Sequence, residues 1–437
     1  MSEITRFTAL AEKAYARSGT VDMEALEQGM RAAAMKDGAH ALTALLRTIR
    51  DHDGPVGCPD CGVAMESQGR RSKEVITLLG DVTIDRVYYR CEGCDARLFP
   101  KDGLLDVKHT SFSPGVRRLM AKSGARESFA RAEEDLWEYA RIRVDAKDVE
   151  RVAEAIGADI ATREEIERRE AMAGHLPAPG KPVPVLYVAA DGTGVPVTKK
   201  ETAGRKGKQG DAKTREAKLG CVFTQVETDR KGFPVRQEGS TTYTGAIETA
   251  EVFGERLWTE ALARGLLHAE LVVVLGDGAH WIWNLAALHF PHALHIVDLY
   301  HAREHLFALL KLIFSPGAFY EARCKEWSGW LDEGKAEKII SAASALLPKE
   351  EQGRKSATTE IEYFKANRER MRYADFRARG LFVGSGVVEA GCKNVIGARM
   401  KKSGARWSVR GANDIIALRC TLASSRFEDY WAERASV

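Results

Sequence analysis

Two apolar segments of the sequence each end in an acidic residue flanked by glycine. Asp191 lies in ADGTG after the run VPVLYVA, and Asp277 lies in LGDGA after the run ELVVV. Asp-Gly pairs also form ordinary turns, so neither motif is specific by itself. At the strand ends of an open α/β sheet, however, glycine lets a phosphate or a metal ion approach the backbone. The two carboxylates are therefore candidate ligands of a cation at a sheet edge.

A third candidate carboxylate, Glu389, lies downstream in GSGVVEAGCKNVIGARMKKSGARWS. If residues 385–401 form one α-helix, one of its faces carries an apolar stripe with an acid and an amine at its margin: Glu389, Cys392, Lys393, Ile396 and Met400. Lys393 would then pair with Glu389 or with a phosphate. A buried acid is costly unless it is paired or binds a metal. Three carboxylates on separate elements suit two Mg²⁺ ions about 4 Å apart, which is the arrangement of a phosphoryl-transfer site.

The elements that must position these acids follow one another as strands and helices after residue 185. Strand patterns cover residues 183–197, 216–229 and 233–244, a helix pattern covers 245–265, buried strand patterns cover 269–276 and 293–300, and a helix begins at His280 between those two. Three consecutive strands, a crossover helix and two further buried strands indicate an α/β sheet of the ribonuclease H type. The pattern alone leaves this as one option among several.

The cysteines form a second candidate site. Four of the eight are paired, as CPDC (Cys58 and Cys61) and CEGC (Cys91 and Cys94), with a strand-like segment between the pairs. Two such knuckles match the four-thiolate site of a zinc ribbon. The segment 62–90 is longer than the usual spacing, so we expect an extra hairpin, and with no open ligand position we expect structural zinc. The alternatives are a redox pair or unliganded thiols; the remaining cysteines, 221, 324, 392 and 420, are expected to be buried free thiols.

The rest of the chain divides into further segments. We expect an N-terminal helical region over 1–50, the zinc ribbon over 51–105, and a helical region over 106–175. The break at RIRVDAKDV, with Asp145 as N-cap, suggests a helix-turn-helix that contacts DNA, although many helical hairpins look alike without doing so. The proline-rich segment 176–184 is the expected linker, and 185–437 is the expected catalytic domain.

Composition excludes several classes of protein. The chain has 437 residues, 44% of them apolar and 29% charged, which is typical of a multidomain globular protein. It contains no apolar run of the roughly 18 residues needed to span a membrane, and its first residues lack the pattern of a secretion signal, so we expect a cytoplasmic protein without a membrane partner. The net charge is only +3, but basic residues concentrate in 198–218 and 391–413. Such runs form either solvated surface or phosphate-binding surface.

Taken together, these segments resemble the DDE transposases of bacterial insertion sequences, in particular the Kra-type group related to the Mutator-like superfamily. The motifs that carry the resemblance extend over most of the chain: GDVTIDRVYYRCEGC, ADGTGVPV, GRKGKQGDAKTREAKLGCVFTQ, VVLGDGAHWIWN, IVDLYHAREHL and GSGVVEAGCKN. The resemblance implies a ribonuclease H-like catalytic domain with an all-helical insertion at about 315–380. It implies that Asp191, Asp277 and Glu389 are the catalytic acids and bind Mg²⁺, as two ions that Mn²⁺ can replace.

The same resemblance assigns accessory roles. Asp298 and His301 in DLYH match an Asp-x-x-His signature that positions DNA or supports the site; the alternative is a capping Asp and a packed His. The basic runs would contact DNA phosphates through Lys199, Lys200, Arg205, Lys206, Lys208, Arg399, Lys401, Lys402 and Arg406. Because Trp281 and Trp283 are two residues apart on a helix, one is expected in the core and the other could stack on a base; Trp407 has the same two options.

The expected activity is that of a transposase, associated with the nucleoid, which binds terminal inverted repeats and catalyses Mg²⁺-dependent strand cleavage and strand transfer into target DNA. The helical N-terminus and the zinc ribbon would recognise the repeats in double-stranded DNA. Pairing two element ends implies a homodimer or a higher homo-oligomer. Two alternatives remain: a domesticated transposase that acts as a DNA-binding regulator without chemistry, and a structure-selective nuclease.

Overall fold

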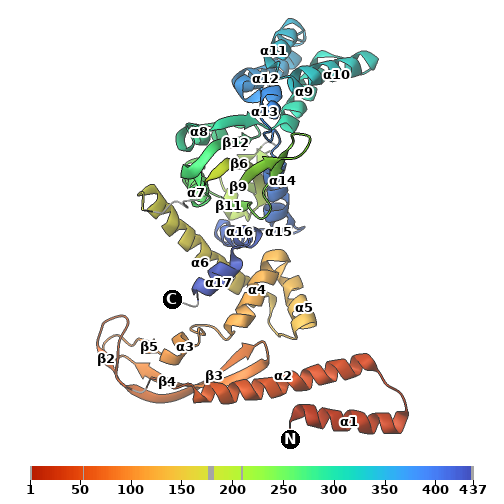
Figure 1. Cartoon of the computed structure of the whole chain (residues 1–437). Helices are drawn as coiled ribbons and strands as arrows, with labels where there is room; N and C mark the ends of the chain where they lie inside the picture. Colours follow the sequence, from red (N-terminus) through yellow and green to blue (C-terminus); the bar gives the residue numbers. More distant parts are fainter. Residues whose placement is uncertain (1, 53, 176–181, 208–209, 435–437) are drawn as a thin grey trace. The chain divides into compact units, whose positions relative to one another are not determined.

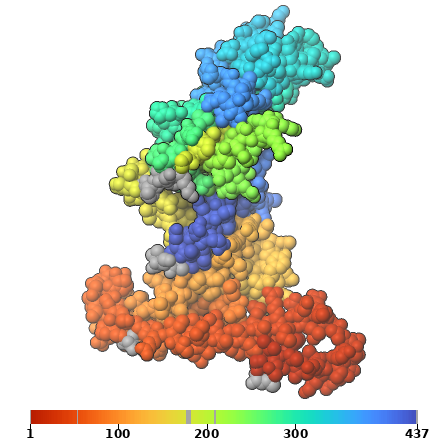
Figure 2. All heavy atoms as spheres, in the orientation of Figure 1, coloured from red at the N-terminus to blue at the C-terminus, as the bar shows by residue number. Residues whose placement is uncertain are grey.

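The computed structural model describes residues 2–52, 54–175, 182–207 and 210–434 (Figures 1 and 2). The chain forms two compact units, residues 1–153 and 154–436. The boundary lies inside helix α6 (Ala146–Met172), not at the proline-rich segment 176–184. Of that expected linker, residues 176–181 lie outside the described residues and 183–184 begin strand β6. No helix among the described residues has the length and apolar character needed to cross a membrane.

The first unit begins with two helices, α1 (Glu3–Ser18) and α2 (Met23–Thr48), each started by an N-cap side chain, Ser2 and Asp22. After α2, the chain forms the knuckle strands β1 (Val56–Gly57) and β2 (Ala64–Met65) and the sheet strands β3 (Ser67–Thr77), β4 (Gly80–Arg90) and β5 (Arg97–Leu98), which build the cysteine module. The long antiparallel β3–β4 hairpin is the extra hairpin expected between the cysteine pairs. Its inner face packs against α2 through Ala39, Val75, Val82 and Ile84.

Three further helices complete the first unit and lead out of it: α3 (Pro100–Leu104), α4 (Pro114–Arg126) and α5 (Phe129–Ala140), followed by α6. The expected N-cap of α6 is confirmed, because the Asp145 carboxylate accepts the N–H of Asp148 at 2.7 Å. The second half of α6 belongs to the other unit. There, Arg256 of α7 (Ala250–Ala263) donates to Glu164 at 2.7 Å, and Gly157 lies against the Asp414 carbonyl, where only a residue without a side chain fits.

The second unit contains a mixed sheet in the order β10-β9-β6-β12-β13. Its strands are β6 (Val183–Pro196), β9 (Thr214–Thr228), β10 (Pro234–Arg236), β11 (Thr242–Ala246), β12 (Ala269–Gly276) and β13 (Leu294–Val297). Strand β9 runs antiparallel to β6, whereas β12 runs parallel to both β6 and β13. The expected third strand over 233–244 is divided into β10 and β11, which both pair with β9. Between β6 and β9, the chain forms a short helix, η1 (Lys199–Thr202), and a hairpin, β7 (Lys206–Gly207) and β8 (Gly210–Asp211).

Helices surround this sheet, and its central strands are continuously apolar because both faces are covered. After β12 come α8 (His280–His289) and α9 (Leu299–Ile313); the chain then forms α10 (Ala318–Asp332), α11 (Ala336–Ala345), α12 (Glu351–Asn367), η3 (Arg368–Met371) and α13 (Tyr373–Ala378). It returns to the sheet as α14 (Gly386–Gly391), a π-helix (Cys392–Gly397) and α15 (Ala398–Met400), and ends with α16 (Val409–Ala423) and α17 (Phe427–Arg434). One hydrophobic core joins the sheet to the helical region through residues such as Val188, Val274, Leu306 and Phe364.

Candidate functional site

The strand register places Asp191 and Asp277 at the same level of the sheet. Leu275 of β12 pairs with Ala189 of β6 in a parallel arrangement. Asp191 lies two residues further along β6, and Asp277 lies two residues further along the chain, directly after β12 ends at Gly276. In neighbouring parallel strands, residues at one level point to the same face. Both carboxylates are half-buried. Two acids that are distant in the sequence therefore come together at the carboxyl edge of the sheet, where ligands of open α/β sheets bind.

Each of these carboxylates also accepts a hydrogen bond from a backbone N–H one or two residues further along the chain. The Asp191 carboxylate accepts the N–H of Gly192 at 2.7 Å, and the Asp277 carboxylate accepts the N–H of Ala279 at 2.9 Å. Gly278, between Asp277 and Ala279, has φ +100, and a Cβ on this glycine would lie 2.5 Å from the ring of Tyr363. Glycine is required there because a side chain would both strain the backbone and collide with that ring.

The third acid, Glu389, comes from a short helix that packs directly on the sheet. A Cβ at Gly391 would lie 2.6 Å from the ring of Tyr243 and 2.9 Å from the Leu219 side chain, so α14 reaches the sheet only because this residue is glycine. At the start of α14, the Ser385 hydroxyl donates to the Glu389 carboxylate at 3.2 Å. Glu389 is half-buried, like the other two acids.

The pKa of Asp191 is affected by both other acids. Burial raises the pKa of Asp191, and the negative charges of Asp277 and Glu389 raise it further. Hydrogen bonds from the Cys392 thiol and the Gly192 N–H oppose this increase. Like charges act on one another in this way only when they are close and poorly solvated. Asp277 and Glu389 thus both lie near Asp191, and a bound cation would relieve the repulsion that the Asp191 carboxylate experiences.

The three carboxylates supply oxygen donors, the type of ligand that a hard divalent cation takes. Among the described residues, only the four paired cysteines place three or more ligand atoms within 4.8 Å of one another, so the three carboxylates are more widely spaced than that. Oxygen ligands are also those that Mg²⁺ and Mn²⁺ prefer.

The helix that carries Glu389 differs from the expected one. Residues 385–401 do not form one α-helix, because the π-helix at Cys392–Gly397 adds a residue to the turn. The change of register turns the Cys392 thiol toward Asp191 and leaves Lys393 exposed. No described carboxylate pairs with Lys393, so the expected Glu389–Lys393 pair is not formed. Single π turns inside helices are frequent at functional sites.

Asp298 supports the site from within the protein. The residue is 0% exposed, and its carboxylate caps α9 by accepting the N–H of His301 at 2.6 Å. The other carboxylate oxygen accepts the N–H of Ser385, the residue whose hydroxyl reaches Glu389. His301 is half-buried and packs edge-on against His305, with ring centroids 5.0 Å apart. Capping and packing thus account for this pair, and through Ser385 the cap also fixes the start of α14.

The two basic runs of the sequence lie next to each other. A parallel bridge joins Val197 to Trp407, and Lys401 donates to Thr193 of β6 at 2.5 Å, just beyond Asp191. The basic residues that line this edge are exposed or half-buried: Lys199, Lys200, Arg205, Lys206, Lys401, Lys402 and Arg406. Lys206 pairs with Asp211 at 2.9 Å. Lys208 lies outside the described residues.

Arg399 differs from the other predicted DNA contacts. Its side chain is only 3% exposed, and its guanidinium lies 4.8 Å from the centre of the Trp407 ring. It therefore stabilises the packing of the Trp407 segment and is not available at the surface. Trp407 itself is buried and donates to the Met400 carbonyl at 3.1 Å. Its role is that of a core residue.

The tryptophans after Asp277 also pack inside. Trp283 is 6% exposed, stacks on His295 and lies under the Arg370 guanidinium. Trp281 is half-buried and packs edge-on against Phe253, with ring centroids 5.8 Å apart. The core assignment holds for Trp283, and the remaining exposed edge of Trp281 is the only part of the pair that a base could reach.

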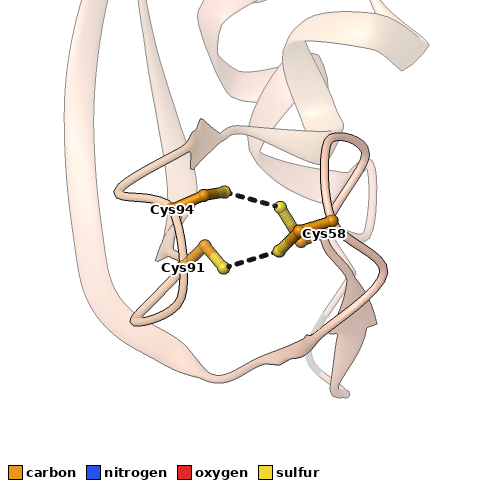
Figure 3. Close-up of side chains that lie close together, drawn as sticks. Cys58, Cys91 and Cys94 are labelled. Atoms are coloured by element: carbon orange, nitrogen blue, oxygen red, sulfur yellow. Dashed lines mark hydrogen bonds between the residues drawn. The ribbon is translucent and has the colours of Figure 1, made fainter.

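The four paired cysteines converge as the spacing predicts. The Sγ atoms of Cys58 and Cys94 are 3.5 Å apart, as are those of Cys61 and Cys91 (Figure 3). Each knuckle is closed by matching backbone hydrogen bonds, from Cys58 to the Val63 carbonyl at 2.8 Å and from Cys91 to the Ala96 carbonyl at 2.9 Å.

The thiols of this cluster differ in acidity. Backbone N–H groups lower the pKa values of Cys61 and Cys94, but hydrogen bonds with the neighbouring thiols raise both values overall. Burial alone would raise the pKa of the Cys58 thiol, but the N–H groups of Asp60 and Cys61 lower it to about 7. A thiol that loses its proton near neutral pH is a good metal ligand. Four sulfurs in this arrangement could bind zinc.

Sequence reasoning missed three residues that organise the acid cluster: Ser385, Cys392 as a hydrogen-bond donor, and Tyr363. Tyr363 comes from α12 and donates to the Asp277 carbonyl at 3.1 Å. The signal for Ser385 was present, because a serine four residues before Glu389 begins the same short helix. Nothing local in the sequence indicates Tyr363, since its partner lies on another element.

Comparison with known proteins gives a distant structural similarity. No protein-family model matches the chain, and no curated protein matches it. Among solved structures, the chain is similar to the Drosophila P element transposase strand transfer complex, with a TM-score of 0.34 and 8% sequence identity. The match covers 71% of this chain and 92% of that chain.

Proposed function

We propose that the protein is a DDE transposase of the Kra-type group, which binds the terminal inverted repeats of an insertion sequence and catalyses DNA strand cleavage and strand transfer. The observation that carries this proposal is the carboxylate cluster. Asp277 and Glu389 both raise the pKa of Asp191, although the three residues come from strand β6, the end of strand β12 and helix α14. Carboxylates gathered at the carboxyl edge of a sheet are what metal-dependent phosphoryl transfer requires.

The topology of the second unit supports a ribonuclease H-like catalytic domain over residues 185–437. Strands β6, β9 and the pair β10/β11 are antiparallel neighbours, and β12 and β13 extend the sheet in parallel on the other side of β6. The helices α10 to α13 interrupt this domain between β13 and the helix of Glu389, which agrees with an all-helical insertion at about 315–380.

In this proposal, Asp191, Asp277 and Glu389 hold two Mg²⁺ ions, which when bound activate the attacking oxygen and stabilise the leaving oxygen. The chain's own groups orient the ligands. The Gly192 N–H and the Cys392 thiol fix the Asp191 carboxylate, and the Ser385 hydroxyl fixes Glu389. Fixed ligands matter because a preorganised site needs no rearrangement during the reaction.

The basic residues at the edge of β6 would hold DNA phosphates next to these acids. Lys199, Lys200, Lys401 and Lys402 lie just beyond Asp191 on two adjoining segments. Neutralising phosphates with such residues releases counterions and makes binding dependent on salt. The first unit, with structural Zn²⁺ in its cysteine cluster, would recognise the repeat sequence. Bringing two element ends together requires a homodimer or a larger assembly.

The test uses Asp277→Asn, with Asp375→Asn as a matched control at an exposed position away from the cluster. We expect Asp277→Asn to bind a duplex of the inverted repeat that flanks the coding sequence, but to lose Mg²⁺-dependent cleavage and joining to target DNA. The control should retain both. Undiminished joining by Asp277→Asn would refute the proposal. Binding without cleavage by the wild type would favour a DNA-binding regulator, and cleavage without joining would favour a nuclease.

A further inference from the structure

A cavity of about 410 Å³ lies within the first unit, and no cysteine lines it. Its walls are α2, the β3–β4 hairpin next to its turn, and the C-terminal end of α5 with the segment that follows. Three arginines line this cavity, Arg31 on α2 and Arg141 and Arg143 after α5. Asp81 of β4 is the only carboxylate among its lining residues.

The positive charge of this cavity is permanent, because arginine stays protonated in proteins. No carboxylate of the described part of the chain lies within ion-pair distance of Arg31 or Arg143. Arg141 lies 3.7 Å from Glu138, whose side chain is 66% exposed and does not line the cavity. Three guanidinium groups against two carboxylates, Asp81 and Glu138, still leave an excess of positive charge at this place.

Two of the arginines are held by neutral acceptors. Arg31 donates to the Tyr139 carbonyl at 2.5 Å, and Arg141 donates to the side-chain oxygen of Gln28 at 2.8 Å. These bonds join α2 to the end of α5. A neutral acceptor orients a guanidinium without cancelling its charge, and each bond uses only one of the five N–H donors of that group. The remaining donors are available to a ligand.

The indole of Trp137 brings two of the charges together. The guanidinium carbon of Arg143 lies 4.8 Å from the ring centroid, and that of Arg141 lies 5.3 Å from it. Trp137 lines the cavity and is 40% exposed. Both cations are attracted by the ring but repel each other. An anion bound between them would relieve this repulsion.

The backbone of Arg141 gives an independent sign that its side chain is used. The residue caps α5 with φ +56, in the left-handed region. Glycine takes this C-cap conformation without strain and is the residue usually found there. The chain therefore carries an arginine where a glycine would form the same cap more easily. Such strain is typical of positions at which a side chain serves a function.

We propose that this arginine pocket, formed by Arg31, Arg141, Arg143 and Trp137, binds phosphates of the DNA backbone. The inference rests on the proposed function, in which the first unit binds the terminal repeats. Guanidinium groups bind phosphate oxygens through paired hydrogen bonds. Pockets for small molecules measure about 300–1,000 Å³, so 410 Å³ has room for a phosphate with its adjoining sugars.

This assignment differs from the helix-turn-helix that the segment RIRVDAKDV suggests. In a helix-turn-helix, the second helix enters the major groove and reads base edges. Here Arg141 and Arg143 lie in the break before α6, and their partner Arg31 comes from α2. Phosphate contacts fix the position of a protein on the duplex but carry no sequence information. The pocket would therefore hold repeat DNA and unrelated DNA equally well.

The experiment compares two double variants of the full chain that remove the same charge from the first unit. The cavity variant is Arg31→Gln/Arg143→Gln. The control is Arg131→Gln/Arg151→Gln, which removes exposed arginines of α5 and α6 that pair with neighbouring acids outside the cavity. For the cavity variant, the slope of log K against log salt should fall by about 2, and binding should weaken about tenfold. The control should keep the wild-type slope.

Each protein is measured on the repeat duplex and on an unrelated duplex of equal length. We expect the cavity variant to lose the same factor on both duplexes. Equal slopes for the cavity variant and its control would overturn the proposal. A loss confined to the repeat duplex, with an unchanged slope, would also overturn it, because the pocket would then read bases.

Two single substitutions test the geometry in opposite directions. Arg141→Gly should stay folded, because glycine takes φ +56 without strain, but should bind DNA more weakly. Asp81→Asn removes the opposing carboxylate and should bind more tightly than Glu74→Gln, which removes an exposed acid outside the cavity. Wild-type affinity in Arg141→Gly, or no difference between Asp81→Asn and Glu74→Gln, would contradict the assignment.

Two further arms separate the possible outcomes. If a polyglutamate peptide binds the wild type but not the cavity variant, while both proteins bind the duplexes equally, the pocket takes an acidic protein and the DNA assignment is wrong. Cleavage by Asp277→Asn is measured on the same repeat duplex. If this variant cleaves normally, the proposed function itself fails, whatever the slopes are. If it is inactive while the cavity variant and its control share one slope, only the present inference fails.

Discussion

Removing the Asp298 carboxylate tests whether the third acid is positioned from within the core. The carboxylate is fully buried and joins two elements by accepting the N–H of His301 at the start of α9 and the N–H of Ser385 before α14. Ser385 then donates its hydroxyl to Glu389 at 3.2 Å. Asp298→Ala removes both hydrogen bonds, so this substitution should destabilise the fold and also displace Glu389.

The size of the effect follows from these two bonds. Loss of a helix N-cap costs about 1 kcal/mol, and leaving the buried Ser385 N–H without an acceptor costs about 1–3 kcal/mol. The sum is about 2–4 kcal/mol, which for a unit of this size lowers the Tm by roughly 3–7 °C. If Glu389 moves by about 1 Å, cleavage should fall by roughly 100-fold even in protein that remains folded.

The assay measures Tm by calorimetry and single-turnover cleavage of the repeat duplex well below the Tm of each variant. Asp298→Asn should keep one of the two bonds and thus more of the stability, but it places an amide against a backbone N–H and should still lose most of the cleavage rate. Asp22→Ala, which removes the N-cap of α2 in the other unit, is the control and should cost about 1 kcal/mol without slowing the chemistry. An unstable Asp298→Ala that cleaves at the wild-type rate would refute the reasoning.

Three other predictions concern the packing of α14, the cysteine cluster and the acid cluster. Gly391→Ala should reduce cleavage and lower the Tm, because its Cβ would lie 2.6 Å from the Tyr243 ring; an unchanged Tm would contradict this contact. Chelation of metal, or Cys58→Ser, should abolish hydrogen-exchange protection of residues 56–98 while leaving the sheet of the other unit protected. Burial and like charges raise the pKa of Asp191 in the folded state, so its contribution to stability is greatest below the ordinary value of 3.8 and falls as pH rises through the raised pKa. Asp191→Asn should therefore raise the Tm of metal-free protein more at pH 7 than below pH 3.8, and the reverse order would argue against the repulsion.

Much of the candidate site could be predicted because its signals are local. The cysteine pairs predict the cluster, since each knuckle aims two sulfurs at one point through its own turn. Asp191 and Asp277 could be placed at one sheet edge because each directly follows an apolar run with the pattern of a buried strand. Asp145 was identified as an N-cap for the same reason, as its partner lies three residues away.

Contacts between distant elements could not be predicted from these patterns. An ideal helix over 385–401 places Lys393 beside Glu389. In the structure, this segment contains a π turn, and the Lys393 side chain is exposed to solvent. The basic run suggested that Arg399 binds phosphate, but its guanidinium is buried against Trp407. The unit boundary lies inside α6 because Gly157 and its neighbours pack against α16, a contact that no local composition reveals.

The sequence by itself determined which side chains are able to do chemistry and on which strand ends and knuckles they lie, because strand periodicity and ligand spacing are properties of short segments. Only the tertiary structure decided how these groups act together. It directs the Asp298 carboxylate into the core toward Ser385, and it brings Tyr363 to the Asp277 loop. The physical reason is that a buried polar group must find its partner wherever packing places one, and that partner can lie anywhere in the chain.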